Sequence, residues 1–223
     1  MSRQTANSEG VLIFLRIGDL RGALGENARR EHPVDAGKDA VDLEVSQAAM
    51  MAAGAGSLLA GLGADVIKVE APVGDAFRDT GFVYNRGMRG LAIDLRQPAG
   101  QQAFHRLVET SDAVIDNSRL GVAARLKADY AALSAVNPRI VTLSIAGFGE
   151  QGPEAHRPAF DPVLQAMSGM MRAQGGDSDP MFFTIPINDV VAAVTAVFAV
   201  CLGLYHRGIS GVGQRTWTSL AAS

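Results

Sequence analysis

The sequence predicts an α/β protein with a doubly wound, mostly parallel sheet. Short runs rich in Val, Ile and Leu alternate along the chain with longer segments whose apolar residues recur at helical spacing. This alternation is typical of a parallel sheet with helices packed on both faces. Hydrophobic residues make up 48% of the 223 residues, enough for a substantial core without disulfides. Such sheets bind ligands at the carboxyl ends of their strands, here near residues 70–71, 117–118 and 147–149.

The predicted elements follow one another in a regular order after residue 40. Apolar runs bounded by turn residues predict strands at 65–70, 89–96, 112–117 and 139–149, and "QRTWTSL" begins a strand or the segment after one. Helical patterning predicts helices at 47–62, 97–111, 120–136, 161–173 and 189–206. Pro98 supports the start of the second helix, and Pro138 ends the third.

Residues 1–40 differ from the rest of the chain. After a short apolar run at 11–17, the stretch to residue 40 is polar and poorly periodic, which is typical of a linker. The run is too short for a signal-peptide core and contains Arg16. We therefore predict an atypical N-terminal segment or linker at 1–40 and a large domain at 41–223. The chain stops in mid-pattern at "SLAAS", so we expect this domain to be incomplete at its C-terminus.

Charge and hydropathy restrict the partners. The net charge is −3, and no basic excess indicates a nucleic-acid partner. The uncharged run 190–205 is shorter than the ~20 residues that span a bilayer, so we interpret it as a buried core helix and expect a soluble, cytoplasmic protein with no membrane partner. Cys201 lies in this run, which favours a buried thiol in a reducing compartment over a reactive one. The four histidines are scattered, so we expect no metal site.

The segment "TIPINDVVAAVTAVFAV" at 184–200 places one carboxylate, Asp189, between an extended approach and the long apolar helix. A helix N-terminus stabilises an anion through its free N–H groups and the helix dipole. A carboxylate with an ordinary pKa near 4 is ionised at neutral pH, and carboxylates can act as covalent nucleophiles. The residues alone favour the simpler alternative, in which Asp189 is an N-cap worth about 1 kcal/mol.

Five stretches, in this order, resemble the class III CoA-transferases, the family of formyl-CoA transferase, carnitine CoA-transferase and α-methylacyl-CoA racemase. They are "LLAGLGADVIKVEAP", "NRGMRGLAIDLRQPAGQQAFHRLV", "DAVIDNSRLGVAARLKADYAALSAVNPRIVTLSIAGFGEQGP", "RPAFDPVLQAMSGMM" and "IPINDVVAAVTAVFAVCLGLYHRGISGVGQR". Each stretch alone is modestly specific, but five in a row make the resemblance strong. Residues 1–40 do not match the family's usual start, and we expect the family's small domain to be missing from this chain.

The resemblance implies a Rossmann-like large domain, an interlinked homodimer when the chain is full length, and coenzyme A or acyl-CoA as substrate with no metal. It also implies that Asp189 is the nucleophile, whose carboxylate attacks an acyl-CoA thioester and then carries CoA until an acceptor acid takes it. With this motif around Asp189, we favour the nucleophile over the N-cap. The expected enzyme is a CoA-transferase that moves CoA from an acyl-CoA thioester to a carboxylic acid.

The resemblance further implies which residues bind CoA. Arg96 follows the "AIDL" strand, where the family places a basic residue on the nucleotide, and Asn117 stands where the family has "VEN" with a CoA contact. Arg125 matches an arginine that reaches the phosphates, and Arg89 is a lesser candidate. The alternative for each is a solvated surface charge or a turn residue.

The sequence departs from the family pattern at several positions. Racemases of the family carry a histidine where this chain has Phe160, and Phe160 cannot serve as an acid or a base. This argues against an acyl-CoA racemase or isomerase, which remains an alternative beside a non-catalytic CoA-binding or dimerisation unit. Asp161 either orients groups in the site or caps its own helix. Ser118 and Leu120 replace a common Phe and Pro, which weakens the expected contact with the adenine side of CoA.

Overall fold

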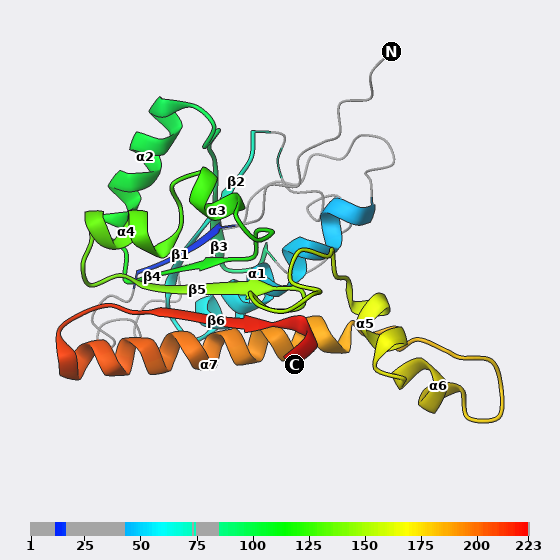
Figure 1. Ribbon diagram of the computed structural model, residues 1–223. Helices are drawn as coiled ribbons and strands as arrows, with labels where there is room; N and C mark the ends of the chain where they lie inside the picture. The colour runs from blue at the N-terminus through cyan, green and yellow to red at the C-terminus, as the bar shows by residue number, and fades with distance from the viewer. Residues whose placement is uncertain (1–11, 17–42, 73, 75–84, 223) are drawn as a thin grey trace, which may run out of the picture.

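The structure is a computed structural model that describes residues 12–16, 43–72, 74 and 85–222 (Figure 1). Within these residues, six strands form one sheet in the order β3-β2-β1-β4-β5-β6. The strands are β1 (Leu12–Arg16), β2 (Asp65–Glu70), β3 (Met88–Ala92), β4 (Ala113–Asp116), β5 (Val141–Ala146) and β6 (Arg215–Ser219). The helices are α1 (Leu43–Gly61), α2 (Pro98–Val108), α3 (Val122–Arg125), α4 (Tyr130–Val136), α5 (Asp161–Met167), α6 (Met170–Gly175) and α7 (Ile187–Ser210), with a 3₁₀ turn, η3, at Leu220–Ala222.

Five of the described strands run in one direction, and β1 runs against them. The pairs β2–β3, β4–β5 and β5–β6 are parallel, whereas β1 pairs antiparallel with both β2 and β4. The predicted α/β fold with a mostly parallel sheet is therefore confirmed, with a central antiparallel strand that the sequence pattern did not predict.

β1 falls within residues 1–40, which we predicted as an atypical segment or linker. Residues 12–16 are instead a core strand, because four consecutive apolar side chains, Leu12 to Leu15, are buried between the two helical layers. The predicted boundary between residues 40 and 41 lies outside the described residues.

Helices cover both faces of the sheet (Figure 1). On one face, α1 and α7 pack on side chains that include Ile13 and Ile115. On the other face, Phe14 of β1 meets Phe104 of α2 edge to face, with ring centroids 4.9 Å apart, and α4 adds Leu133 to this second core. The alternation of side chains along the strands thus supplies two separate cores, as in a doubly wound sheet.

Two predicted helices are each broken in two by a residue with positive φ. The predicted helix 161–173 is divided into α5 and α6, where Gly169 has a φ of 81°. The predicted helix 120–136 is divided into α3 and α4, and Lys127 between them has a φ of 56°. Helical periodicity continues across both breaks, so the sequence pattern alone did not reveal them.

α7 lies close against β5 because its inner face consists of small residues. Ala192 and Ala196 are fully buried, and at Gly203 a Cβ atom would lie only 2.7 Å from Cγ1 of Val141. The start of α7 lies at the carboxyl-end edge of the sheet, beside the C-terminal turn η3, which directly follows β6 (Figure 1). Asp189 is therefore at the edge where ligands bind to such sheets.

The outer face of α7 is exposed, so the predicted buried core helix is wrong for that part of its surface. Cys201 is exposed as well, because the helix packs on the sheet through one stripe only. α7 is long and apolar enough to cross a membrane, but the core helix of a globular protein meets the same criteria of length and composition. The inner face of α7 packs on the sheet. The exposed apolar residues include Val191, Val194, Phe198, Leu202, Tyr205 and Ile209.

Candidate active site

Asp189 is buried in the first turn of α7 and does not cap this helix. α7 begins at Ile187, its N-cap position is Pro186, and no side chain of that position makes a capping hydrogen bond. Asp189 is only 4% exposed, and its Oδ2 has no hydrogen-bond partner among the described residues. The simple N-cap interpretation of Asp189 is therefore wrong, because another residue satisfies the helix start.

That residue is Asp161, the first residue of α5. Its Oδ2 accepts hydrogen bonds from the backbone N–H groups of Asn188, at 2.6 Å, and Asp189, at 3.2 Å. The N-cap of α5 itself is Phe160, so Asp161 does not cap its own helix. A buried carboxylate at the N-terminus of α7 is stabilised by charge-assisted hydrogen bonds and by the helix dipole. Of the two alternatives for Asp161, the structure therefore supports the one in which it orients groups in the site.

Gln165 connects Asp161 to the segment that leads into α7. This glutamine is fully buried and lies one turn after Asp161 on α5. Its Nε2 donates a hydrogen bond to Asp161 Oδ1, and its Oε1 accepts one from the backbone N–H of Phe183 at 2.7 Å. Sequence reasoning missed Gln165, although its spacing of four residues from Asp161 on a predicted helix was a signal.

The environment of Asp189 changes its protonation. Burial, and then the negative charge of Asp161, raise the pKa of Asp189 from 3.8 to about 7. The expectation of a fully ionised carboxylate with an ordinary pKa was therefore wrong, because the sequence does not show that this side chain loses its water. The protonated form of Asp189 is therefore favoured over a wider pH range than for an exposed aspartate.

The residues predicted to bind CoA do not all lie together. Asn117 directly follows β4 and is buried, and Arg125 ends α3, where it is exposed. Arg96 lies beyond the carboxyl end of β3 and pairs with Asp94 at 2.8 Å. These three follow the carboxyl ends of β3 and β4, which point to one edge of the sheet.

Arg89 lies elsewhere. It is the second residue of β3, and its Nε and Nη2 donate hydrogen bonds to Oδ1 and Oδ2 of Asp65, at 3.1 and 2.6 Å. Asp65 begins β2, so this ion pair is at the amino-end edge of the sheet, away from the other candidates.

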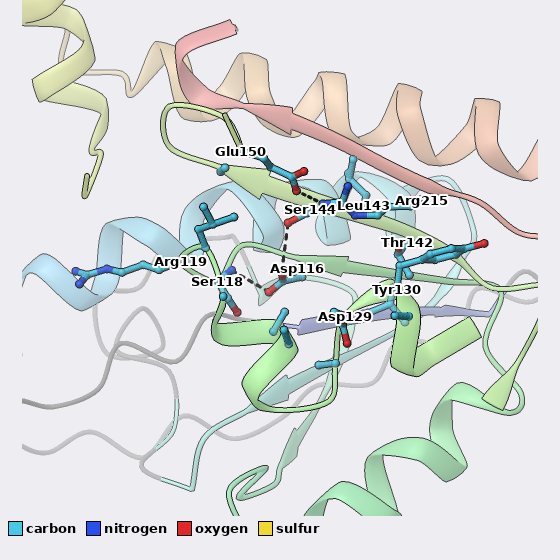
Figure 2. Close-up of a pocket in the computed structure, with 18 residues that line it drawn as sticks. Asp116, Ser118, Arg119, Asp129, Tyr130, Thr142, Leu143, Ser144, Glu150 and Arg215 are labelled. Atoms are coloured by element: carbon cyan, nitrogen blue, oxygen red, sulfur yellow. Dashed lines mark hydrogen bonds and ion pairs between the residues drawn. The ribbon is translucent and has the colours of Figure 1, made fainter. Parts of the chain in front are cut away.

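A cavity of about 480 Å³ opens between β4, β5 and the α3–α4 region (Figure 2). Its wall includes Asp116 at the end of β4, whose Oδ1 accepts a hydrogen bond from the backbone N–H of Ser118 at 2.8 Å. Burial raises the pKa of Asp116, and the hydrogen bonds from Ser118 and Ser144 oppose this shift. An ion pair between Glu150 and Arg215 closes one side. Asp189 is not among the residues that line this cavity.

Comparison with known proteins matches residues 41–223 to the CoA-transferase family III. The chain belongs to this family. It is 38% identical over 179 residues to a succinate–glutarate CoA-transferase of Agrobacterium fabrum, covering 72% of this chain and 45% of the relative. It is 34% identical over 178 residues to an acetyl-CoA:oxalate CoA-transferase of Acetobacter aceti, covering 74% and 46%.

The fold is also similar to solved structures. A CAIB/BAIF family protein from Brucella suis superposes with a TM-score of 0.73 at 34% identity, covering 77% of this chain and 50% of that one. Rv3272 from Mycobacterium tuberculosis superposes with a TM-score of 0.72 at 30% identity, with the same coverage. The predicted family is thereby confirmed, and the chain spans about half the length of the relatives it matches.

Proposed function

We propose that this family member transfers CoA from an acyl-CoA thioester to a carboxylic acid, and that Asp189 is the nucleophile. The observation that carries the proposal is the Asp189 carboxyl itself. It is buried at the ligand-binding edge of the sheet, its Oδ2 has no hydrogen-bond partner among the described residues, and a second carboxylate already caps the helix. A carboxylate held this way is not needed for capping, and its free oxygen is available to attack.

The chemistry balances without a metal or an added proton. The Asp189 carboxylate attacks the thioester carbonyl, the C–S bond breaks, and CoA leaves as a thiolate while a mixed anhydride remains. The thiolate then attacks the side-chain carbonyl carbon of Asp189, which releases the donor acid as a carboxylate and leaves an aspartyl-CoA thioester. An acceptor carboxylate reverses both steps, forms the new acyl-CoA and regenerates Asp189.

The raised pKa of Asp189 has two opposing effects on the first step. A more basic carboxylate is a stronger nucleophile, and burial removes the water that would otherwise shield it. Below its pKa of about 7, however, the ionised fraction falls about tenfold per pH unit. The two effects together favour reaction at or above neutral pH.

CoA would be held by the residues at the carboxyl ends of the strands. We assign the phosphate contacts to Arg125 and Arg96 and a further CoA contact to Asn117, and we give Arg89 the weakest claim because it lies at the opposite edge of the sheet, where it pairs with Asp65. Since two relatives are named for succinate–glutarate and oxalate, we propose short dicarboxylic acids as acceptors. The interlinked homodimer implied by the family stays a proposal for the complete polypeptide, to be checked by sedimentation.

Trapping of the covalent intermediate tests the proposal. The protein is mixed with succinyl-CoA, acetyl-CoA or formyl-CoA, treated with hydroxylamine, and analysed by intact-mass and peptide mass spectrometry. We expect a mass change on the peptide that contains Asp189, lost in Asp189→Ala and retained in the control Asp177→Ala, which changes an exposed aspartate in a turn. A folded protein that binds CoA without any such change would instead indicate a non-catalytic CoA-binding unit. Incorporation of solvent deuterium at the α-carbon of a 2-methylacyl-CoA would indicate the racemase.

A further inference from the structure

Gln165 uses both polar atoms of its carboxamide group to connect α5 with the segment that leads into α7. Nε2 donates to Asp161 Oδ1 and lies 3.5 Å from the backbone carbonyl of Phe183, whose N–H donates to Oε1. Both backbone groups of Phe183, its N–H and its carbonyl, thus face the carboxamide of Gln165, as they would face a neighbouring strand. Phe183 precedes α7 by four residues, so this contact positions the chain as it enters the helix.

We propose that Gln165 is a positioning residue for the transfer reaction: by fixing the Asp161 carboxylate and the backbone of Phe183, it sets the place of Asp189 at the start of α7. The proposal rests on the proposed function of Asp189. It adds a fully buried residue, out of reach of substrate, whose hydrogen bonds go to Asp161 and Phe183.

Burial makes this arrangement specific. Gln165 is fully buried, and Asp161 and Asn188 are 2% and 5% exposed, so water cannot replace a lost hydrogen bond in this network. A methionine of similar length would leave Asp161 Oδ1 and the backbone groups of Phe183 without these partners. Asp161 would then lose its second anchor and could turn away from the N–H groups of Asn188 and Asp189.

The substitution Gln165→Glu distinguishes a positioning role of Gln165 from a role in packing alone. Its carboxylate can still accept from the N–H of Phe183, but it cannot donate to Asp161 while it is ionised, and the two like charges repel. When it is protonated, its O–H can donate to Asp161 as the amide does. The effect of Gln165→Glu should therefore depend on the ionisation of the new carboxyl group, whereas Gln165→Met should slow the reaction at every pH.

The test measures the rate of hydroxylamine-trapped labelling of Asp189 by the reactive acyl-CoA, together with the Kd of CoA. For Gln165→Met we expect labelling about a hundredfold slower than in the wild type, as for a nucleophile misplaced by about 1 Å, with the Kd of CoA within about threefold. For Gln165→Glu we expect the labelling rate relative to the wild type to fall at least tenfold as the pH rises from about 6 to 8. Gln174→Met, which changes an exposed glutamine on α6, is the matched control and should label normally.

The outcomes are distinguishable. If the wild type is never labelled at Asp189, the proposed function of Asp189 fails, and the Gln165 proposal fails with it. If the wild type is labelled and folded Gln165→Met labels at a similar rate, only the Gln165 proposal is overturned. If Gln165→Met does not fold, Gln165→Glu decides: a labelling rate relative to wild type that does not change with pH overturns the proposal.

Discussion

The start of α7 and the strand ends that carry the predicted CoA-binding arginines are built in opposite ways. At the start of α7 three side chains are buried, those of Asp161, Gln165 and Asp189. Hydrogen bonds of Asp161 and Gln165 connect α5 to the first turn of α7 and to the segment that leads into it. Arg96 and Arg125 are exposed at the surface. The contrast suggests that a nucleophile needs a fixed, desolvated place before substrate arrives, whereas cations that bind phosphates can stay hydrated until then.

Asp189→Asn tests the buried side of this comparison and should have the largest effect. The amide is similar in size but has no ionisable oxygen to attack the thioester, so we expect labelling and CoA transfer to fall at least about a thousandfold. Mass spectrometry and a transfer assay with a CoA acceptor measure this loss. A substantial rate retained by the Asp189→Asn variant would show that another group carries the acyl or CoA intermediate.

The pH dependence of labelling is the next largest expected effect. Because the pKa of Asp189 is about 7, the wild-type rate should rise about tenfold per pH unit up to pH 7 and then level off. In Asp161→Asn one of the two causes of the raised pKa is removed, so the midpoint should move to lower pH. Stopped reactions at a series of pH values give both midpoints, and identical midpoints would argue against electrostatic coupling of the two residues.

The burial of Asp189 should also make the free energy of unfolding depend on pH. The folded-state pKa of Asp189 is raised above its ordinary value of 3.8, so the folded protein binds more protons than the unfolded chain between about pH 4 and pH 7. The resulting contribution to stability is complete at low pH and is lost as the pH rises through about 7. In urea unfolding, the free energy of unfolding of Asp189→Asn should rise relative to that of the wild type as the pH increases from about 4 to 7, by a few kcal/mol at most.

On the exposed side, two arginine variants should differ from each other. Arg125→Ala removes a cation that no described residue engages, and we expect the Kd of CoA to rise about tenfold at low salt and less at high salt. Arg89→Ala breaks the ion pair with Asp65 at the opposite edge of the sheet, and the Kd should change less than about twofold. Isothermal titration calorimetry measures both, and equal effects would place the CoA phosphates elsewhere.

A good part of the fold could be predicted from local pattern. The strand 65–70 was predicted with its bounds as found, because its β-branched run is bounded by turn residues on both sides. The site was predicted less completely. Asp189 was singled out as a nucleophile through the family resemblance, since its place at the start of an apolar helix alone favoured an N-cap. Gln165 was missed because its contact with Phe183 joins residues 18 positions apart.

The sequence by itself determined the mostly parallel α/β sheet, the family and the position of Asp189 at the start of a long apolar helix, since these depend on local pattern and motif order. Only the tertiary structure decided that β1 runs antiparallel in the centre of the sheet, that Cys201 and the outer face of α7 are exposed, and that Asp161 caps α7. It also decided the pKa of Asp189, because desolvation and the charge of Asp161 arise only when distant segments pack together.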